Sequence, residues 1–295
     1  YNQLFVQLRS KQPFKALEIA KQELAIAEKI NFLKGTGDSY NNQGLIYNDQ
    51  GDYARALENH NKALEIREKI GDKKTVANSL NNIGTVYHLQ GDYGKTMDFY
   101  LRSLRVREDM DDQKGIANSY NNIGLLLVDE KNYDKALEYF EKALKTREDM
   151  GDKKGMAQSY NNFGLTYSSQ KNFIKAIEYQ LKALDILNQS GDTRERAMAL
   201  NNLGHAYAKN DDFIQALTYY LKSLELRKSL GDREGITTSY MNIAEVYSKQ
   251  KNLPKALDYF NRSLEIAKGI GAKKRIKDSY QGVSEIYMKM GDYKS

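Results

Sequence analysis

Asparagine carboxamides are the groups in this sequence whose spacing points most clearly to chemistry. They occur as adjacent pairs at a step of forty residues, namely Asn41-Asn42, Asn81-Asn82, Asn121-Asn122, Asn161-Asn162 and Asn201-Asn202. A carboxamide offers both a donor and an acceptor, which suits the backbone of an extended peptide whatever its side chains. Asparagine inside a helix costs roughly 0.5 kcal/mol relative to alanine, so helix propensity does not explain the pairs. The pattern therefore predicts a polar recognition surface.

The sequence offers little support for enzymatic chemistry. His60, His88 and His205 occur singly, without the partner spacing of a metal site, and His60 is expected to pack in the core. Cysteine is absent, which excludes thiolate chemistry and disulfides. The Gly-Asp pairs are expected at helix ends, so none forms a phosphate-binding loop. We therefore predict no catalytic residue, no metal site and no cofactor, and we do not expect an enzyme.

The forty-residue step predicts an array of helical hairpins. In the second unit, Gly71-Asp72 predicts a helix end followed by an N-cap, and apolar residues at helical spacing predict a first helix to about Gln90. Gly91-Asp92 repeats the signal before a second helix that ends near Met110. Connections this short make neighbouring helices antiparallel. Where the glycine is missing, an asparagine is expected to support the turn, in Lys131-Asn132, Lys171-Asn172 and Lys251-Asn252.

We predict one all-α array over residues 1–295. Its complete units are 31–70, 71–110, 111–150, 151–190, 191–230 and 231–270, and partial units lie at 1–30 and 271–295. In the first partial unit, Gln3 to Ser10 is expected to end one helix. Phe14 to Ile30 is expected to form the next helix, with Phe14 first among its apolar residues. Because both ends fall within a unit, we expect the sequence to be an excised fragment.

Residues at matching places in the units resemble those of the tetratricopeptide repeat family. In the second unit, Leu80, Ile83, Gly84 and Tyr87 match the family's first-helix pattern. Small residues match early in the second helix, at Ala56, Thr96, Ala136, Ala176, Ala216 and Ala256. They match again later in that helix, at Ala63, Ser103, Ala143, Ala183, Ser223 and Ser263. The family's aromatic residue between them falls on Tyr100, Phe140, Tyr220 and Phe260, with His60 and Gln180 as exceptions.

The step of forty, instead of the family's usual thirty-four, is similar to kinesin light chain and Pins-type repeats and to sensor regions of bacterial signalling proteins. The resemblance implies a right-handed α-solenoid in which the first helix of each unit lines a concave, peptide-binding groove. The residues it implies for this groove are Asn41, Asn78, Asn81, Asn82, Asn118, Asn121, Asn122, Leu125, Gln158, Asn161, Asn162, Leu165, Asn201 and His205. For the second asparagine of each pair, a brace to the adjacent helix is the open alternative.

Charge also changes along this surface. Asp49 and Asp129 lie in the early units, whereas lysines follow in the late ones, at Lys209, Lys249 and Lys289. This predicts a peptide whose acidic end lies over the last units, with a merely solvated face as the alternative. A net charge of +6 from 45 basic and 39 acidic residues is weak evidence for a nucleic-acid partner, and we predict none.

We therefore predict a non-catalytic interaction module that binds an extended peptide segment of a partner protein, within a signalling or scaffold protein. The competing hypothesis is a structural spacer that self-associates end to end through its exposed end units. No apolar run is long enough to cross a bilayer, so membrane insertion is not expected. A soluble, cytoplasmic protein is expected, with a periplasmic sensor region as the alternative.

Overall fold

The computed structural model describes residues 5, 8, 9 and 12–291. Within these residues the chain forms fourteen helices and no strand. The all-α class and the hairpin architecture predicted from the sequence are therefore confirmed. The expected helix end over Gln3 to Ser10 lies largely outside the described residues.

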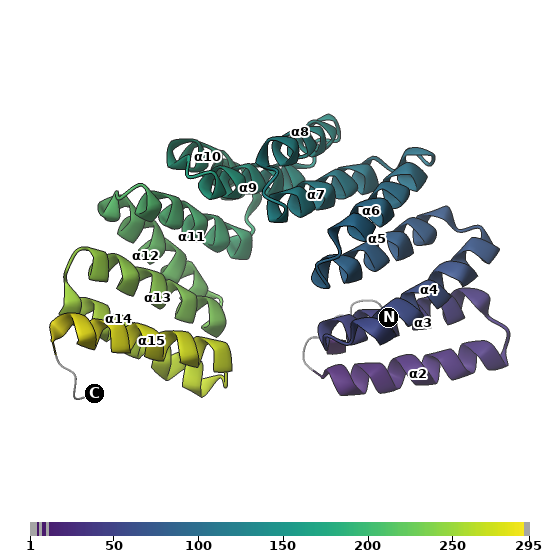
Figure 1. Cartoon of the computed structure of the whole chain (residues 1–295), viewed down its shortest axis with the longest axis horizontal. Coiled ribbons are helices and arrows are strands. Elements are labelled where there is room, and N and C mark those ends of the chain that lie inside the picture. Colours follow the sequence, from purple (N-terminus) through teal and green to yellow (C-terminus); the bar gives the residue numbers. More distant parts are fainter. Residues whose placement is uncertain (1–4, 6–7, 10–11, 292–295) are drawn as a thin grey trace. The chain divides into compact units, whose positions relative to one another are not determined.

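The chain divides into two compact units between Met150 and Gly151, which is also a predicted repeat boundary. Each of these two units contains several of the forty-residue repeats, which are called hairpins below. The first unit contains α2 (Pro13–Lys29), α3 (Leu33–Asp49), α4 (Tyr53–Ile70), α5 (Lys73–Leu89), α6 (Tyr93–Glu108), α7 (Gln113–Asp129) and α8 (Tyr133–Asp149). The second contains α9 (Lys153–Ser169), α10 (Phe173–Ser190), α11 (Thr193–Lys209), α12 (Phe213–Ser229), α13 (Arg233–Lys249), α14 (Leu253–Gly269) and α15 (Lys273–Met290). In each unit, consecutive helices pack against one another as hairpins (Figure 1). One continuous array over both units stays a prediction.

The helix boundaries follow the Gly-Asp signals. Gly71 has the left-handed conformation, with a φ of 77°, and Asp72 then caps α5 by accepting a hydrogen bond from the backbone N–H of Thr75 at 3.2 Å. The same cap begins α4, α6, α7, α9, α11, α12 and α13. A glycine that ends one helix and an aspartate that begins the next therefore set the length of every hairpin that carries the pair.

The turns that lack the glycine differ from the expectation. Lys131, Lys171 and Lys251 themselves take the left-handed conformation, with φ values of 61°, 61° and 59°. The asparagine that follows does not replace the glycine. Asn172 and Asn252 instead cap the next helix by accepting from a backbone N–H. The turn needs its positive φ one residue before the cap, so the strained position falls on the lysine.

Small residues let the two helices of a hairpin approach closely. The alanines, serines and threonine at the two matching places in the second helices are all fully buried. In the first helix, Gly84 faces the ring of Tyr100, and a Cβ atom there would lie 2.7 Å from that ring. His60 is buried in the equivalent place against Gly44, as expected. The packing signature read from the sequence is therefore confirmed.

Burial in α2 follows the apolar spacing at Ala20 and Ala27 but not at Phe14. Phe14 is 81% exposed, and α2 buries Ala16, Ala20 and Ala27 instead. Residues 16, 20 and 27 share one stripe of the helix, whereas residue 14 lies about 200° around the helix from residue 16.

Candidate functional site

The predicted site residues lie on the first helices of the hairpins. These are α3, α5 and α7 in the first unit and α9, α11, α13 and α15 in the second. Within a unit these helices also contact one another, since α3 meets α5, α9 meets α11, and α13 meets both α11 and α15. The asparagine pairs are half-buried at these contacts. Each unit therefore brings its carboxamides together across neighbouring hairpins.

Hydrogen bonds join these carboxamides into a ladder. The asparagine at the second position of the pair, or Asn242 after Met241, donates from Nδ2 to Oδ1 of the first asparagine in the preceding hairpin. The bonds are Asn82 to Asn41 at 2.9 Å, Asn122 to Asn81 at 2.8 Å, Asn202 to Asn161 at 2.7 Å and Asn242 to Asn201 at 2.9 Å. The bracing alternative is therefore seen for Asn82, Asn122 and Asn202. Asn162 is half-buried on α9, and Asn121 lies on α7.

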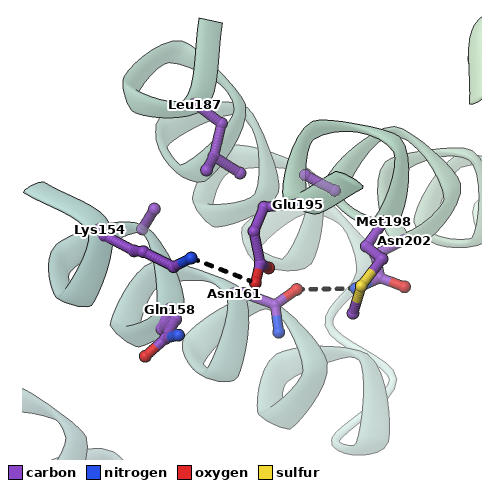
Figure 2. A pocket seen from close by; sticks show the side chains of 9 residues that line it. Lys154, Gln158, Asn161, Leu187, Glu195, Met198 and Asn202 are labelled. Carbon is purple, nitrogen blue, oxygen red and sulfur yellow. Dashed lines mark hydrogen bonds and ion pairs between the residues drawn. The ribbon is translucent and has the colours of Figure 1, made fainter. Parts of the chain in front are cut away.

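The ladder has a fixed polarity. Arg67, whose guanidinium can only donate, also meets Oδ1 of Asn41 at 3.4 Å, which orients that amide. Among the described residues, no acceptor takes the Nδ2 hydrogens of the first asparagines Asn41, Asn81, Asn161 and Asn201. Figure 2 shows the Asn161 nitrogen on the side of its amide away from Asn202. The ladder thus uses the Oδ1 acceptors of these first asparagines and leaves their Nδ2 donors for other partners.

Buried arginines near the ends of the second helices contact the predicted site residues, and the sequence analysis did not predict them. Arg107 donates to the backbone oxygen of Gly115 at 2.7 Å and to Oδ1 of Asn78 at 3.2 Å. Arg147 reaches Oδ1 of Asn118 at 3.4 Å. Burial lowers the pKa of Arg107, against the attraction of Asp112. The missed signal is an arginine that recurs at the forty-residue step, at Arg67, Arg107, Arg147 and Arg227.

These arginines change the interpretation of Asn78 and Asn118. Both side chains are exposed on the first helices, as predicted, but each already accepts a hydrogen bond from a buried guanidinium. Arg67 contacts Asp38 in the same way, at 2.8 Å, and also donates to Oγ of Ser79 at 2.7 Å. The guanidinium therefore ties three consecutive helices together and holds the residue that faces solvent.

Two leucines give the surface an apolar component. Leu125 is 40% exposed and Leu165 is 43% exposed, each three residues after the second asparagine of its helix. Gln158, one turn before the pair in α9, is exposed as well. Exposed leucines on the helices that carry the carboxamides suit a peptide that offers both backbone and side chains.

Charged groups gather on the first helices of the second unit. His205, Lys209, Glu245 and Lys249 line one shallow cavity, and Lys289 donates to Oγ of Ser248 at 2.8 Å beside it. The protein atoms around Glu245 raise its pKa, and Lys209 and Lys249 oppose this. Desolvation lowers the pKa of His205, and the same two lysines lower it further. An acidic peptide end at this place stays a prediction.

One of the two acidic residues expected on the first unit is paired with a cation, and the other is hydrogen-bonded to a histidine. Asp49 forms an ion pair with Arg9, with Nη2 of Arg9 2.7 Å from Oδ1 of Asp49. Oδ2 of Asp129 lies 2.7 Å from Nε2 of His88. The contrast in charge along the first helices is therefore weaker than the sequence alone indicates.

A small cavity opens in the second unit between α9 and α11 (Figure 2). Its volume of about 50 Å³ has room for a few water molecules. Its wall combines polar and apolar groups from α9, α10 and α11, namely Lys154, Ala157, Gln158, Asn161, Leu187, Glu195, Met198, Ala199 and Asn202. Two of the predicted site residues, Gln158 and Asn161, thus meet in one pocket.

In the part of the chain that the structure describes, no three histidine, aspartate or glutamate side chains are gathered to hold a metal ion. None of the described helices has the length and apolar character needed to span a membrane.

Comparison with known proteins identifies the fold. The sequence profile of the tetratricopeptide repeat matches residues 5–69, 35–109, 115–189 and 195–269. No curated protein matches the sequence at a significant level. Three solved structures show the same fold at low sequence identity.

The first is a signal-transduction ATPase with a tetratricopeptide repeat sensor from Pyrococcus horikoshii. It is 17% identical with a TM-score of 0.72, over 97% of this chain and 44% of that one. BtubC (BKLC) from P. vanneervenii is 18% identical with a TM-score of 0.65, over 75% and 93% of the two chains. A Rap protein complexed with competence and sporulation factor is 17% identical with a TM-score of 0.61, over 88% and 76%. The chain therefore belongs to the tetratricopeptide repeat family, whose fold is typical of protein–protein interaction modules and is generally non-catalytic.

Proposed function

We propose that this chain binds an extended segment of a partner protein along its first helices, as part of a signalling or scaffold protein. The observation that carries the proposal is the polarity of the asparagine ladder. Each ladder bond uses the Oδ1 of a first asparagine and leaves its Nδ2 hydrogens without a protein acceptor among the described residues. Amide donors of this kind bind the carbonyl oxygens of a peptide backbone.

The spacing of the donors suits an extended peptide. Packed helices lie roughly 8–10 Å apart, and an extended chain rises about 3.3 Å per residue. Donors from successive hairpins of one unit therefore meet about every third residue of the segment. Leu125 and Leu165, which are exposed, add apolar contacts that select among sequences.

The similar proteins support this proposal by analogy. One Rap protein has been crystallised with competence and sporulation factor, and the Pyrococcus horikoshii ATPase carries its repeats as a sensor. At 17% identity these likenesses carry the fold. The role in this chain rests on its own carboxamides and leucines.

Asparagine-to-aspartate exchanges at the first positions test the role of the donors directly. Aspartate keeps an oxygen for the ladder but replaces the free NH₂ donor with an acceptor. Peptides selected from a random displayed library against the natural chain are then bound to the variant Asn81→Asp/Asn161→Asp/Asn201→Asp. We expect at least about tenfold weaker binding, which corresponds to about 1.4 kcal/mol. Asn61→Asp, which changes an exposed carboxamide on a second helix, is the matched control.

Leucine exchanges test the apolar part with an unusually close control. Leu125→Ser/Leu165→Ser removes leucines that are 40% and 43% exposed on first helices, and Leu181→Ser/Leu221→Ser removes leucines of the same exposures on second helices. We expect only the first pair to weaken the selected peptides. Equal losses of peptide affinity from both leucine pairs would contradict the proposal. So would unchanged affinity in both the asparagine-to-aspartate variant and the Leu125→Ser/Leu165→Ser variant. Light scattering over a dilution series tests the competing spacer hypothesis.

A further inference from the structure

The cavity between α9 and α11 lies where the chain elsewhere places a guanidinium. Leu187, which lines it, is forty residues from both Arg147 and Arg227, and Arg67 and Arg107 continue the series. In those hairpins the arginine reaches from the second helix to one or both of the neighbouring first helices. Arg107, for instance, donates to Asn78 on α5 and to Gly115 on α7. At Leu187 the series is interrupted, and a pocket is present (Figure 2).

The neighbouring residues change together with Leu187. Ser79 and Ser239 accept hydrogen bonds from Arg67 and Arg227 at 2.7 and 3.2 Å, and the matching residue beside the cavity is Ala199. The position occupied by Gly115 and Gly235 in the arginine-bearing hairpins holds Glu195 here. The pocket has therefore lost the internal guanidinium and its serine partner, and has gained a carboxylate.

The acceptors that remain are those a guanidinium needs. Gln158 occupies the position of Asn78 and Asn118, which accept from buried arginines, and its carboxamide lines the pocket. The carboxylate of Glu195 lies 3.9 Å from Nζ of Lys154, while that lysine makes its shorter bond, of 2.9 Å, to Asp192. Two carboxylates thus surround one ammonium group, which leaves negative charge for a second cation.

We propose that this cavity binds the side chain of an arginine in the partner segment, and that the partner supplies here the guanidinium which Arg67, Arg107, Arg147 and Arg227 supply in four other hairpins. The inference rests on the proposed peptide-binding function and specifies a residue that the peptide must carry. Gln158, which is exposed, and Met198, which is 49% exposed, lie on α9 and α11, the helices that carry the donors Asn161 and Asn201. A planar fork of five donors fits the scattered acceptors better than a compact ammonium group does.

Ethylguanidinium is a probe that tests the pocket without any peptide. The methyl resonance of Met198 reports its binding in a carbon–proton NMR titration of the full chain, and the resonance of Met288 serves as an internal reference. We expect a saturable shift of Met198 alone, with a Kd on the order of millimolar. Ethylurea, which has nearly the same shape but no charge, and ethylammonium, which has the charge but no fork, are expected to bind at least about tenfold more weakly. Equal binding of all three probes would overturn the assignment.

Two exchanges at Leu187 give a matched pair of variants. Leu187→Arg restores the internal guanidinium and should abolish the Met198 shift, whereas Leu187→Met keeps the pocket free of charge and should retain the shift. Glu195→Gln, which leaves the core unchanged, should weaken the binding of ethylguanidinium at least about fivefold. This variant still tests the pocket if Leu187→Arg fails to fold. A shift of the same size in the natural chain, Leu187→Arg and Glu195→Gln would refute the proposal.

Capped peptides then connect the pocket to the partner. A library peptide that contains arginine should lose affinity for the natural chain when that residue becomes citrulline. The citrulline peptide should then bind the Leu187→Arg variant as tightly as it binds the natural chain. Free arginine that binds as tightly as the capped peptide would refute a peptide source. Because ethylguanidinium is measured separately, failure of the peptide-binding proposal leaves the probe result intact, and failure of the pocket leaves the asparagine-to-aspartate result intact.

Discussion

Asn122 donates from Nδ2 to Oδ1 of Asn81 at 2.8 Å, and this bond links α7 to α5. The same bond recurs between other first helices, which do not form a hairpin with each other. The ladder therefore links neighbouring hairpins directly through polar groups of their first helices. It also fixes the rotation of each first asparagine, so that its remaining donors face away from the bond.

The Asn81–Asn122 bond should contribute measurably to stability. A half-buried hydrogen bond between neutral groups contributes about 0.5–1.5 kcal/mol. We expect the double-mutant cycle of Asn81→Ala and Asn122→Ala to give a coupling energy of about 1 kcal/mol in urea unfolding. The cycle of Asn61→Ala with Asn122→Ala is the control, because Asn61 is exposed on α4 and bonds only to its own helix at Leu57. A coupling near zero in both cycles would mean that the ladder does not stabilise the stack.

His60 should make the chain sensitive to acid. Its imidazole is buried, and desolvation, with smaller contributions from Arg67 and Arg9, lowers its pKa from 6.5 to about 4. Between these two pH values the unfolded chain binds a proton that the folded chain does not. The stabilising contribution is therefore complete above pH 6.5 and falls as the pH drops, by about 3 kcal/mol by pH 4.

His60→Phe isolates this effect. Phe140 and Phe260 occupy the same place in other hairpins, so phenylalanine fits the fold, and it removes a buried Nδ1 atom that has no hydrogen-bond partner. We expect the variant to exceed the natural chain in unfolding midpoint by much more at pH 4.5 than at pH 7.5. An NMR titration of His60 checks the pKa itself. The same difference at both pH values would show that another group controls the acid sensitivity.

Local patterns were sufficient to predict the hairpins. Gly71-Asp72 marks a boundary because glycine alone takes the left-handed conformation without strain and aspartate caps the next residues, and both effects act within a few residues. Small residues such as Ala56 and Ser103 also recur at one register, so the period shows where two helices touch. The fold was therefore accessible from the sequence.

The candidate site was predictable only in part. That Asn81 and Asn161 would lie on the first helices followed from the register, but the direction of their hydrogen bonds depends on the neighbouring hairpin. Arg107 looks like an ordinary basic residue in the last turn of a helix, and only the tertiary structure shows that it is buried. The cavity beside Leu187 is still harder to predict from the sequence, because it depends on the space left where other hairpins carry an arginine side chain.

Lysines in glycine positions should be a source of strain. Lys131, Lys171 and Lys251 hold φ values of about 60°, where a side chain costs on the order of 1 kcal/mol. Replacing any one of them by glycine should raise the free energy of unfolding by about 1 kcal/mol. Lys135→Gly is the control of opposite sign, since this exposed lysine lies inside α8 and glycine there costs about 1 kcal/mol. Destabilisation by Lys131→Gly would show that the turn is not strained.

Two glycines of one hairpin should respond in opposite directions to the same substitution. An added Cβ at Gly84 would lie 2.7 Å from the Tyr100 ring and 3.3 Å from Cβ of Phe99, so the hairpin must open. Gly94 is exposed on α6, where the nearest atom to an added Cβ is an oxygen of Asp92 at 3.9 Å. We therefore expect Gly84→Ala to cost about 1–3 kcal/mol and Gly94→Ala to stabilise by about 1 kcal/mol in urea unfolding.

A compensating change separates crowding from other effects of Gly84→Ala. Tyr100→Leu shortens the side chain that faces Gly84, and the double variant Gly84→Ala/Tyr100→Leu should lose less stability than the sum of the two single variants. The chain contains a natural precedent, because Ala244 replaces the glycine of α13 and packs in one cluster with Phe260. Additive losses would mean that Tyr100 does not set the distance between α5 and α6, and that backbone conformation at Gly84 does.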